Sequence, residues 1–266
     1  MSGDGRDPVA AALAGYAPIA LEALGEARLL DRFDVKFVAA EPDLAPLLAG
    51  CSPHYDILEI AGVRQFGYET TYLDDAALRL FRAHVGMRPH RCKVRTRRYA
   101  PSGERWLEVK ERQRDGRTVK VRRRLDEVSP AIGLTDAPFD AVPLGVAPES
   151  LAPILTVHYE RITLVAKDRS ERVTIDRQLR WTRGDASATA PGRVLVELKQ
   201  ARRRTSPAWQ VLRDLVSIDE SISKYCLGVV ALIPGVPPGL NRHQLKRLGA
   251  VGTVPLVPRA VLPECA

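Results

Sequence analysis

The most constraining feature of the sequence is a concentration of positive charge between Arg88 and Arg124. These 37 residues hold 15 basic and four acidic side chains, a net charge of +11, whereas the whole 266-residue chain carries +8. Like charges at this density destabilise a fold unless an anion relieves their repulsion. The sequence therefore predicts a polyanionic partner, which is a phosphate chain, a nucleotide or a nucleic acid.

The basic residues alternate with apolar ones, as they do in a β-strand that has one charged face. A turn-forming Asp115-Gly116 pair separates two of the segments, RWLEVKERQ and RTVKVRRRL. We therefore expect three consecutive antiparallel strands with their charged faces on one side of a sheet. The charged positions are Arg91, Lys93, Arg95 and Arg97 in the first strand, Glu108, Lys110 and Arg112 in the second, and Lys120, Arg122 and Arg124 in the third.

The same alternation recurs outside the basic segment. A polar face so rich in arginine and lysine, with single carboxylates between them, is more than a solvated surface. A barrel of about eight strands puts alternate side chains inside and is wide enough for one slender ligand. We therefore predict an α+β fold, an antiparallel β-barrel tunnel with flanking helices. The further polar positions are Arg32, Asp34 and Lys36, then Tyr159 and Arg161, then Arg172, Thr174 and Asp176, and finally Glu197 and Lys199.

Helix signals accompany the strands. Asp74 or Asp75 can cap a helix in AALRLFRAH, Pro207 can open a second helix, and SKYCLGVVAL forms a third. We expect residues 1–30 to be helical or partly mobile, residues 31–233 to form the tunnel domain, and residues 234–266 to be a tail rich in proline and glycine.

Several classes of protein are excluded by composition. The longest apolar run is about half of the roughly 20 residues that a membrane span needs. The first 15 residues hold two aspartates and one arginine, unlike a signal peptide. We therefore expect a cytoplasmic protein. Zinc-ligand spacing and a disulfide framework are both missing among the four cysteines, which are Cys51, Cys92, Cys226 and Cys265.

The order of these segments resembles a known family, the VTC domain. This is the polyphosphate polymerase domain of the vacuolar transporter chaperone complex, within the CYTH-like superfamily of triphosphate tunnel metalloenzymes. The resemblance runs from about Arg32 to the region of Tyr225, and it implies an antiparallel barrel whose tunnel holds basic residues and a few metal-binding acids. It is carried by TTYLDDAALRLFRAHVGMRPHRCKVRTRRY, WLEVKERQRDGRTVKVRR, YERITL, RVTIDRQL, VLVELK and ISKYCLG.

The resemblance implies roles for individual residues. Glu197 would be the ligand of a Mn²⁺ or Mg²⁺ ion, with Asp34 or Asp176 as a helper. The catalytic cations would be Lys36, Arg95, Arg97, Lys110, Arg161 and Arg172. The substrate-binding residues would be Lys120, Tyr159, Lys199, Ser223 and Lys224, to which the charged strand faces add Lys93 and Arg122. We interpret Glu108 as a salt-bridge partner of neighbouring arginines, and Tyr72 and Asp74 as a strand end and a helix cap.

The first strand departs from the superfamily. It has Arg32, Asp34 and Lys36 where two glutamates and a lysine are typical, which favours the polymerase branch over a two-metal triphosphate hydrolase. The resemblance thus implies an ATP-dependent polyphosphate polymerase, a metal-dependent phosphotransferase that binds ATP and polyphosphate or another triphosphate.

Two alternatives stay open. One is a hydrolase of triphosphate or polyphosphate that uses the same tunnel, and the other is a non-catalytic binder of polyphosphate or nucleic acid. Nucleic acid is the least favoured partner, because the three tryptophans, Trp106, Trp181 and Trp209, form no repeated stacking platform among the basic strands.

Overall fold

One curled sheet organises the chain in the computed structural model, which describes residues 7–24, 33–100, 102–115, 118–125, 142–200, 205–215, 217–218, 222–237, 241–249 and 251–253. The helices in these ranges are α1 (Pro8–Ala14), η1 (Glu22–Leu24), η2 (Glu41–Asp43), α2 (Leu44–Cys51), α3 (Arg79–Val85), η3 (Pro148–Ser150), α4 (Pro207–Leu215), α5 (Lys224–Leu232) and α6 (Asn241–Arg247). The strands are β1 (Pro18–Ile19), β2 (Phe33–Ala40), β3 (Tyr55–Leu58), β4 (Phe66–Asp74), β5 (Arg91–Tyr99), β6 (Arg105–Arg112), β7 (Thr118–Leu125), β8 (Ala152–Ala166), β9 (Glu171–Arg183), β10 (Ala186–Thr189), β11 (Arg193–Gln200), β12 (Ser217–Ile218) and β13 (Val251–Thr253).

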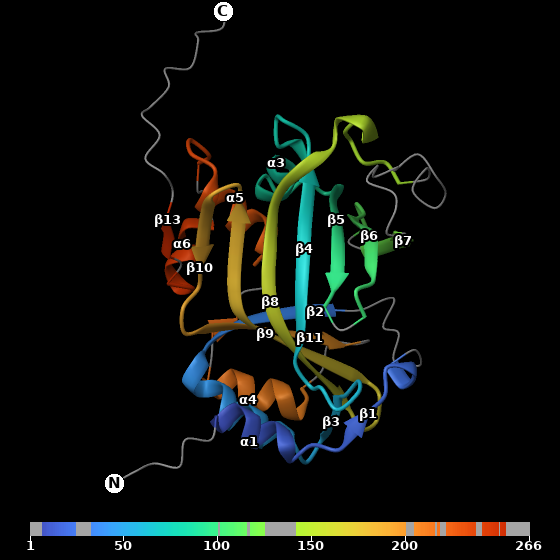
Figure 1. The fold of residues 1–266 in the computed structure, drawn as a ribbon, viewed down its shortest axis with the longest axis vertical. Helices are drawn as coiled ribbons and strands as arrows, with labels where there is room; N and C mark the ends of the chain where they lie inside the picture. The colour runs from blue at the N-terminus through green and yellow to red at the C-terminus, as the bar shows by residue number, and fades with distance from the viewer. Residues whose placement is uncertain are drawn as a thin grey trace, which may run out of the picture.

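The main path of the sheet runs in the order β12-β2-β11-β9-β8-β4-β5-β6-β7, and every pair along it is antiparallel. In Figure 1, β2 and β11 cross beneath the upright strands β4, β5 and β8, so the sheet folds around one concave face. The prediction of an antiparallel sheet with flanking helices is confirmed.

The predicted barrel is not closed by hydrogen bonds between its end strands in the described residues. No ladder joins β7 to β12 or β2 in the described residues, so the sheet is curled and open there. Side chains connect the two ends instead, because Lys110 of β6 reaches Asp34 of β2 at 3.3 Å. Charged side chains that meet across the concave face can hold it curled without a shared ladder.

A β-bulge in β9 lets both halves of the strand present side chains to the concave face. Gln178 has a φ of 53°, and the pairing with β8 shifts between His158 and Glu160. Asp176 precedes the extra residue and Leu179 follows it, yet both lie on the concave face, as their contacts show. Strict alternation would have placed them on opposite faces.

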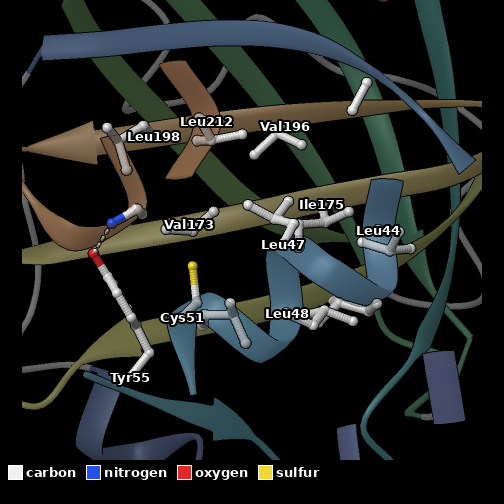
Figure 2. Packing of buried hydrophobic residues seen from close by; sticks show 14 of the residues in the cluster. Leu44, Leu47, Leu48, Cys51, Tyr55, Val173, Ile175, Val196, Leu198 and Leu212 are labelled. Atoms are coloured by element: carbon white, nitrogen blue, oxygen red, sulfur yellow. Dashed lines mark hydrogen bonds between the residues drawn. The ribbon is translucent and has the colours of Figure 1, made fainter. Parts of the chain in front are cut away.

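The convex face is covered by α1, α2 and α4 over β2, β9 and β11. The core there is apolar and fully packed, with the exposed fraction of Leu44, Leu48 and Ile175 at 0%. Figure 2 shows Leu44, Leu47 and Leu48 of α2 beside Val173, Ile175 and Val196 of the strands. The hydroxyl of Tyr55 accepts a hydrogen bond from the amide of Ala208 in α4 at 3.2 Å. This layer leaves the opposite face of the same strands free for polar side chains.

Helix α5 packs on the concave side against an apolar part of the sheet. Leu227 and Val229 are buried with Leu155 and Trp181 of the strands. The helix approaches so closely at Gly228 that a Cβ atom there would lie 2.5 Å from Trp181 Cδ1. The apolar part fixes α5 beside the charged part of the same face.

The helix starts follow the predicted caps. Asp75 accepts a hydrogen bond from the amide of Arg79, and Asp74 accepts from Leu80 and Phe81 at the start of α3. Ser223 caps α5, and α4 begins at Pro207. All three predicted helices are therefore present, although α3 is shorter than the sequence AALRLFRAH.

The segment expected to be a tail, 234–266, contains α6 and β13. Leu248 is fully buried in the α5 core, and β13 pairs with β10 as an antiparallel strand. The predicted Asp115-Gly116 turn, Arg32 and most of 126–151 fall partly or wholly outside the described residues. Within the described ranges, no helix is long and apolar enough to cross a membrane.

Candidate functional site

Three ionic clusters lie on the concave face, each named after its central carboxylate, which is buried in the first two clusters and 22% exposed in the third. The first is the Glu108 cluster, from β5, β6 and β7. Glu108 Oε2 lies 2.7 Å from Arg95 Nη2 and 3.7 Å from Arg97 Nη1, and Oε1 contacts Lys120 Nζ. The side chain of Glu108 is only 1% exposed, so these three cations are its main solvation. This geometry agrees with the interpretation of Glu108 as a salt-bridge partner.

The electrostatics of the Glu108 cluster follow from this arrangement. Burial alone would raise the pKa of Glu108, but Arg95, Arg97 and Lys120 outweigh it and hold the pKa well below its usual range. Burial lowers the pKa of Lys120 to about 8, against the attraction of Glu108. Glu108 therefore stays ionised and keeps the two guanidinium groups in place.

The second is the Asp176 cluster, from β8, β9 and α5. Arg161 grips Asp176 with two hydrogen bonds, Nε to Oδ1 at 2.6 Å and Nη2 to Oδ2 at 2.8 Å, and Lys224 Nζ also contacts Oδ2. Burial would raise the pKa of Asp176, but Arg161 and Lys224 outweigh it and lower the pKa. The fork of Arg161 is thus pre-oriented by a fixed carboxylate.

The third is the Glu197 cluster, from β2, β6 and β11. Glu197 contacts Lys199 Nζ at 2.7 Å, and Asp34 contacts Lys110 Nζ at 3.3 Å. Burial opposes ionisation of Glu197, yet Lys199, Lys36 and Lys110 lower its pKa well below the usual value. Two acids therefore face three lysines, which leaves this cluster with excess positive charge.

A pair of stacked tyrosines joins the first two clusters. Tyr68 and Tyr159 stack with ring centroids 5.3 Å apart. Arg97 lies 5.6 Å and Arg161 5.1 Å from the centroid of Tyr68, and Lys224 lies 4.9 Å from that of Tyr159. Burial would raise the pKa of Tyr159, but Arg97 and Arg161 lower it overall.

Two lysines of the concave face have lowered pKa values because they are buried near other cations. Burial lowers the pKa of Lys93 to about 7. Cys226 raises this pKa, whereas the nearby cations Lys36, Lys110 and Arg95 lower it further. Burial also lowers the pKa of Lys199 to about 8, although Glu197 opposes this. Crowded cations with lowered pKa values favour the binding of an anion.

The remaining predicted residues also lie on or beside this face. Lys36 donates to the carbonyl of Ile222 at 2.8 Å, and Arg172 pairs with Lys199 across the β9–β11 ladder. Arg122 is exposed and lies 4.5 Å from the ring centroid of Trp106. Ser223 uses its hydroxyl to accept from the amide of Cys226, so its first role is structural.

The sequence predicts Tyr159 as a site residue but not its stacking partner Tyr68, and it does not predict the pairing of Asp176 with Arg161. Tyr68 precedes the TTYLDD motif by two positions and carried no signal, because a lone tyrosine in a strand usually indicates packing. Asp176 was considered only as a helper for a metal, whereas it forms the centre of an ion cluster. Its Arg161 partner lies 15 residues away in sequence, and the period-2 pattern placed the two on polar faces without pairing them.

The carboxylates of the Glu197 cluster are the candidate donors for a divalent cation. Among the described residues there is no group of three or more histidine, cysteine or carboxylate side chains close enough to bind one ion. In the β2–β11 ladder Asp34 pairs with Lys199, two residues along β11 from Glu197, so both carboxylates lie on the same face. They offer the carboxylate oxygens that Mn²⁺ and Mg²⁺ prefer. These residues fit an ion that takes its other ligands from phosphate oxygens and water.

A comparison of sequences identifies the family. The sequence profile of the VTC domain matches residues 31–233. The chain belongs to the VTC domain family. No curated protein matches the sequence.

Solved structures show only distant similarity to this VTC domain. HpAC1 from Hippeastrum, described as a candidate adenylyl cyclase with a dominant triphosphatase activity, is 16% identical over 76% of this chain and 98% of its own, with a TM-score of 0.46. A candidate adenylate cyclase from Bacillus halodurans is 11% identical over 69% of this chain and 86% of its own, with a TM-score of 0.43. A protein from Pyrococcus horikoshii is 13% identical over 73% and 97%, with a TM-score of 0.41.

Proposed function

We propose that this VTC domain is an ATP-dependent polyphosphate polymerase that works on the concave face of its sheet. The observation that carries the proposal is the set of buried and half-buried cations on this face. Glu108 and Asp176 orient three of them, and the cations outnumber the described carboxylates of the three clusters. Arg95 and Arg97 present their forks from β5, and Arg161 presents its fork from β8. A triphosphate supplies the negative charge that this face lacks, in the bidentate geometry that arginine prefers.

Phosphoryl transfer requires positioning and charge neutralisation more than covalent work by the protein. An oxygen of the terminal phosphate of the acceptor would attack the γ-phosphorus of ATP. The bond from that phosphorus to the bridging β-γ oxygen would break, and ADP would leave with the electron pair. The acceptor chain would be longer by one phosphate.

The residues of the chain have separate tasks in this scheme. Arg95, Arg97 and Arg161 would hold the transferring phosphates, while Lys110 and Lys199 would offset charge as mobile point charges. Glu197, helped by Asp34, would hold a Mn²⁺ or Mg²⁺ ion, whose positive charge would offset the negative charge of the phosphate oxygens.

Product analysis tests the proposal. The purified protein is incubated with ATP and Mn²⁺, and the products are separated by length. A polymerase yields long-chain polyphosphate and ADP, which is the result we expect. Free phosphate without polymer would instead identify a hydrolase, and no turnover with tight tripolyphosphate binding would identify a binder.

The proposed cellular location of the domain follows from its need for ATP. We propose that the domain acts in the cytoplasm, where ATP is available. Imaging a fluorescent fusion of the chain in its own cells would test this, and signal confined to the medium or to a membrane-enclosed compartment would contradict it.

A further inference from the structure

The start of α5 is fixed to the sheet by hydrogen bonds at Lys224 and at the next residue, Tyr225. The carbonyl of Lys224 accepts a hydrogen bond from Trp181 Nε1 at 2.8 Å. The next residue, Tyr225, donates its hydroxyl to Asp74 Oδ2 at 2.6 Å. The backbone that carries Lys224 into the Asp176 cluster is therefore held at two points.

Asp74 is a rigid anchor for this contact. It is fully buried, and its Oδ1 accepts from the amides of Asp75 at 2.8 Å and Leu80 at 3.0 Å. Its Oδ2 accepts from the amide of Phe81 at 2.8 Å in addition to the hydroxyl of Tyr225. Because the end of β4 and the start of α3 supply three of these four donors, the carboxylate cannot move without breaking both elements.

The ring of Tyr225 reaches the Glu108 cluster from the same position. It stacks on Tyr72 with ring centroids 5.0 Å apart and an interplanar angle of 19°. The hydroxyl of Tyr72 in turn accepts from Arg95 Nη1 at 3.4 Å. The buried side chain of Tyr225 is therefore connected to two separate cations. Lys224 precedes it in α5, and Arg95 of β5 donates to its stacking partner Tyr72.

We propose that Tyr225 is a positioning residue that sets the separation between Lys224 and Arg95, and so the spacing of phosphates along the concave face. The inference rests on the proposed function, because it requires phosphates to bind both cations. It adds a residue that touches no substrate: Tyr225 is 1% exposed and lies behind the cations. Burial raises the pKa of its hydroxyl and Asp74 raises it further, so the hydroxyl remains a donor.

The test is a double-mutant cycle. Tyr225→Phe keeps the ring stacked on Tyr72 and removes only the hydroxyl bond to Asp74. We expect it to lower kcat for polyphosphate synthesis by about tenfold or more, with KM for ATP less affected, because small misplacements of binding groups are costly in turnover. In a Lys224→Ala background, the same change should have less than about a twofold further effect, since the residue it positions is gone.

A matched control separates positioning from loss of stability. Tyr16→Phe also deletes one buried hydroxyl bond, from Tyr16 to the carbonyl of Leu48 at 2.5 Å, in the core on the convex side. We expect it to change kcat by less than about twofold at a similar loss of thermal stability. Equal losses of kcat in Tyr225→Phe and Tyr16→Phe, or full multiplicative losses in the Lys224→Ala background, would overturn the inference.

Calorimetric titration with tripolyphosphate distinguishes failure of the proposed function from failure of the inference about Tyr225. The dissociation constant of tripolyphosphate is measured for the wild type, the two single variants and the double variant, and this measurement needs no turnover. Wild-type protein that binds no tripolyphosphate would overturn the proposed function and this inference with it. Normal binding by the wild type, with independent effects of Tyr225→Phe and Lys224→Ala, would overturn the inference alone.

Discussion

Replacement of Glu108 by glutamine should destabilise the free protein and at the same time strengthen its binding of polyanions. Glu108→Gln keeps the shape of the side chain but leaves Arg95, Arg97 and Lys120 without their buried counter-charge. Breaking a buried ion pair by removing one partner costs about 3–5 kcal/mol. The lower end applies here, about 3 kcal/mol, because Lys120 is 36% exposed and water can solvate it.

The measured quantities are the free energy of unfolding in urea and the melting temperature. A loss of about 3 kcal/mol corresponds to a fall in Tm of about 6–12 °C for a chain of this size. Tripolyphosphate should reduce the difference between variant and wild type, since its phosphates replace the missing charge in the native state only. Turnover should fall nonetheless, because the two guanidinium groups lose the carboxylate that orients them.

The control is Glu69→Gln, which removes a carboxylate on a 45% exposed side chain that lies 4.0 Å from the imidazole of His158. We expect it to change stability by less than about 0.5 kcal/mol. The reasoning would be refuted if Glu108→Gln were no less stable than Glu69→Gln, or if tripolyphosphate failed to narrow its deficit.

Three further predictions concern charge, metal and protons. Arg95→Lys with Arg97→Lys keeps the charge but loses the forked grip, so turnover should fall about 10²-fold while tripolyphosphate affinity weakens modestly; equal small losses in both assays would contradict this. Glu197→Gln should abolish Mn²⁺-dependent turnover, measured by metal titration, and an unchanged titration would place the ion elsewhere. Lys93, with a pKa of about 7, and Lys199, with a pKa of about 8, are partly neutral at pH 8, and bound phosphate should raise both values. Binding at pH 8 should therefore take up protons and weaken as pH rises further, which calorimetry in buffers of different ionisation enthalpy measures; no uptake would count against the prediction.

Strand periodicity predicted most of the fold because alternation is a local property. Lys93, Arg95 and Arg97 lie on the concave face as their period of two requires, and so do Glu197 and Lys199. The bulge at Gln178 could not be predicted, since its positive φ depends on pairing with β8 and not on a glycine in the sequence. The pattern therefore gave no sign that Leu179 and Asp176 share a face.

The cations of the site were predictable as types and positions, but their partners were not. Lys110 and Asp34 are 76 residues apart, and Lys36 and Ile222 are 186 apart, so only the tertiary fold brings them together. The same holds for Tyr225 and Asp74, which are 151 residues apart. Such long-range pairs depend on how the sheet curls, which a single sequence without its contacts does not define.

The most direct test of the central claim is a crystal structure of the protein with bound tripolyphosphate. The account predicts phosphate groups on the concave face, in contact with Arg95, Arg97 and Arg161, with Glu108 and Asp176 still ion-paired behind them. Phosphates bound only on the convex face or at exposed arginines such as Arg122, with the concave clusters unchanged, would contradict it.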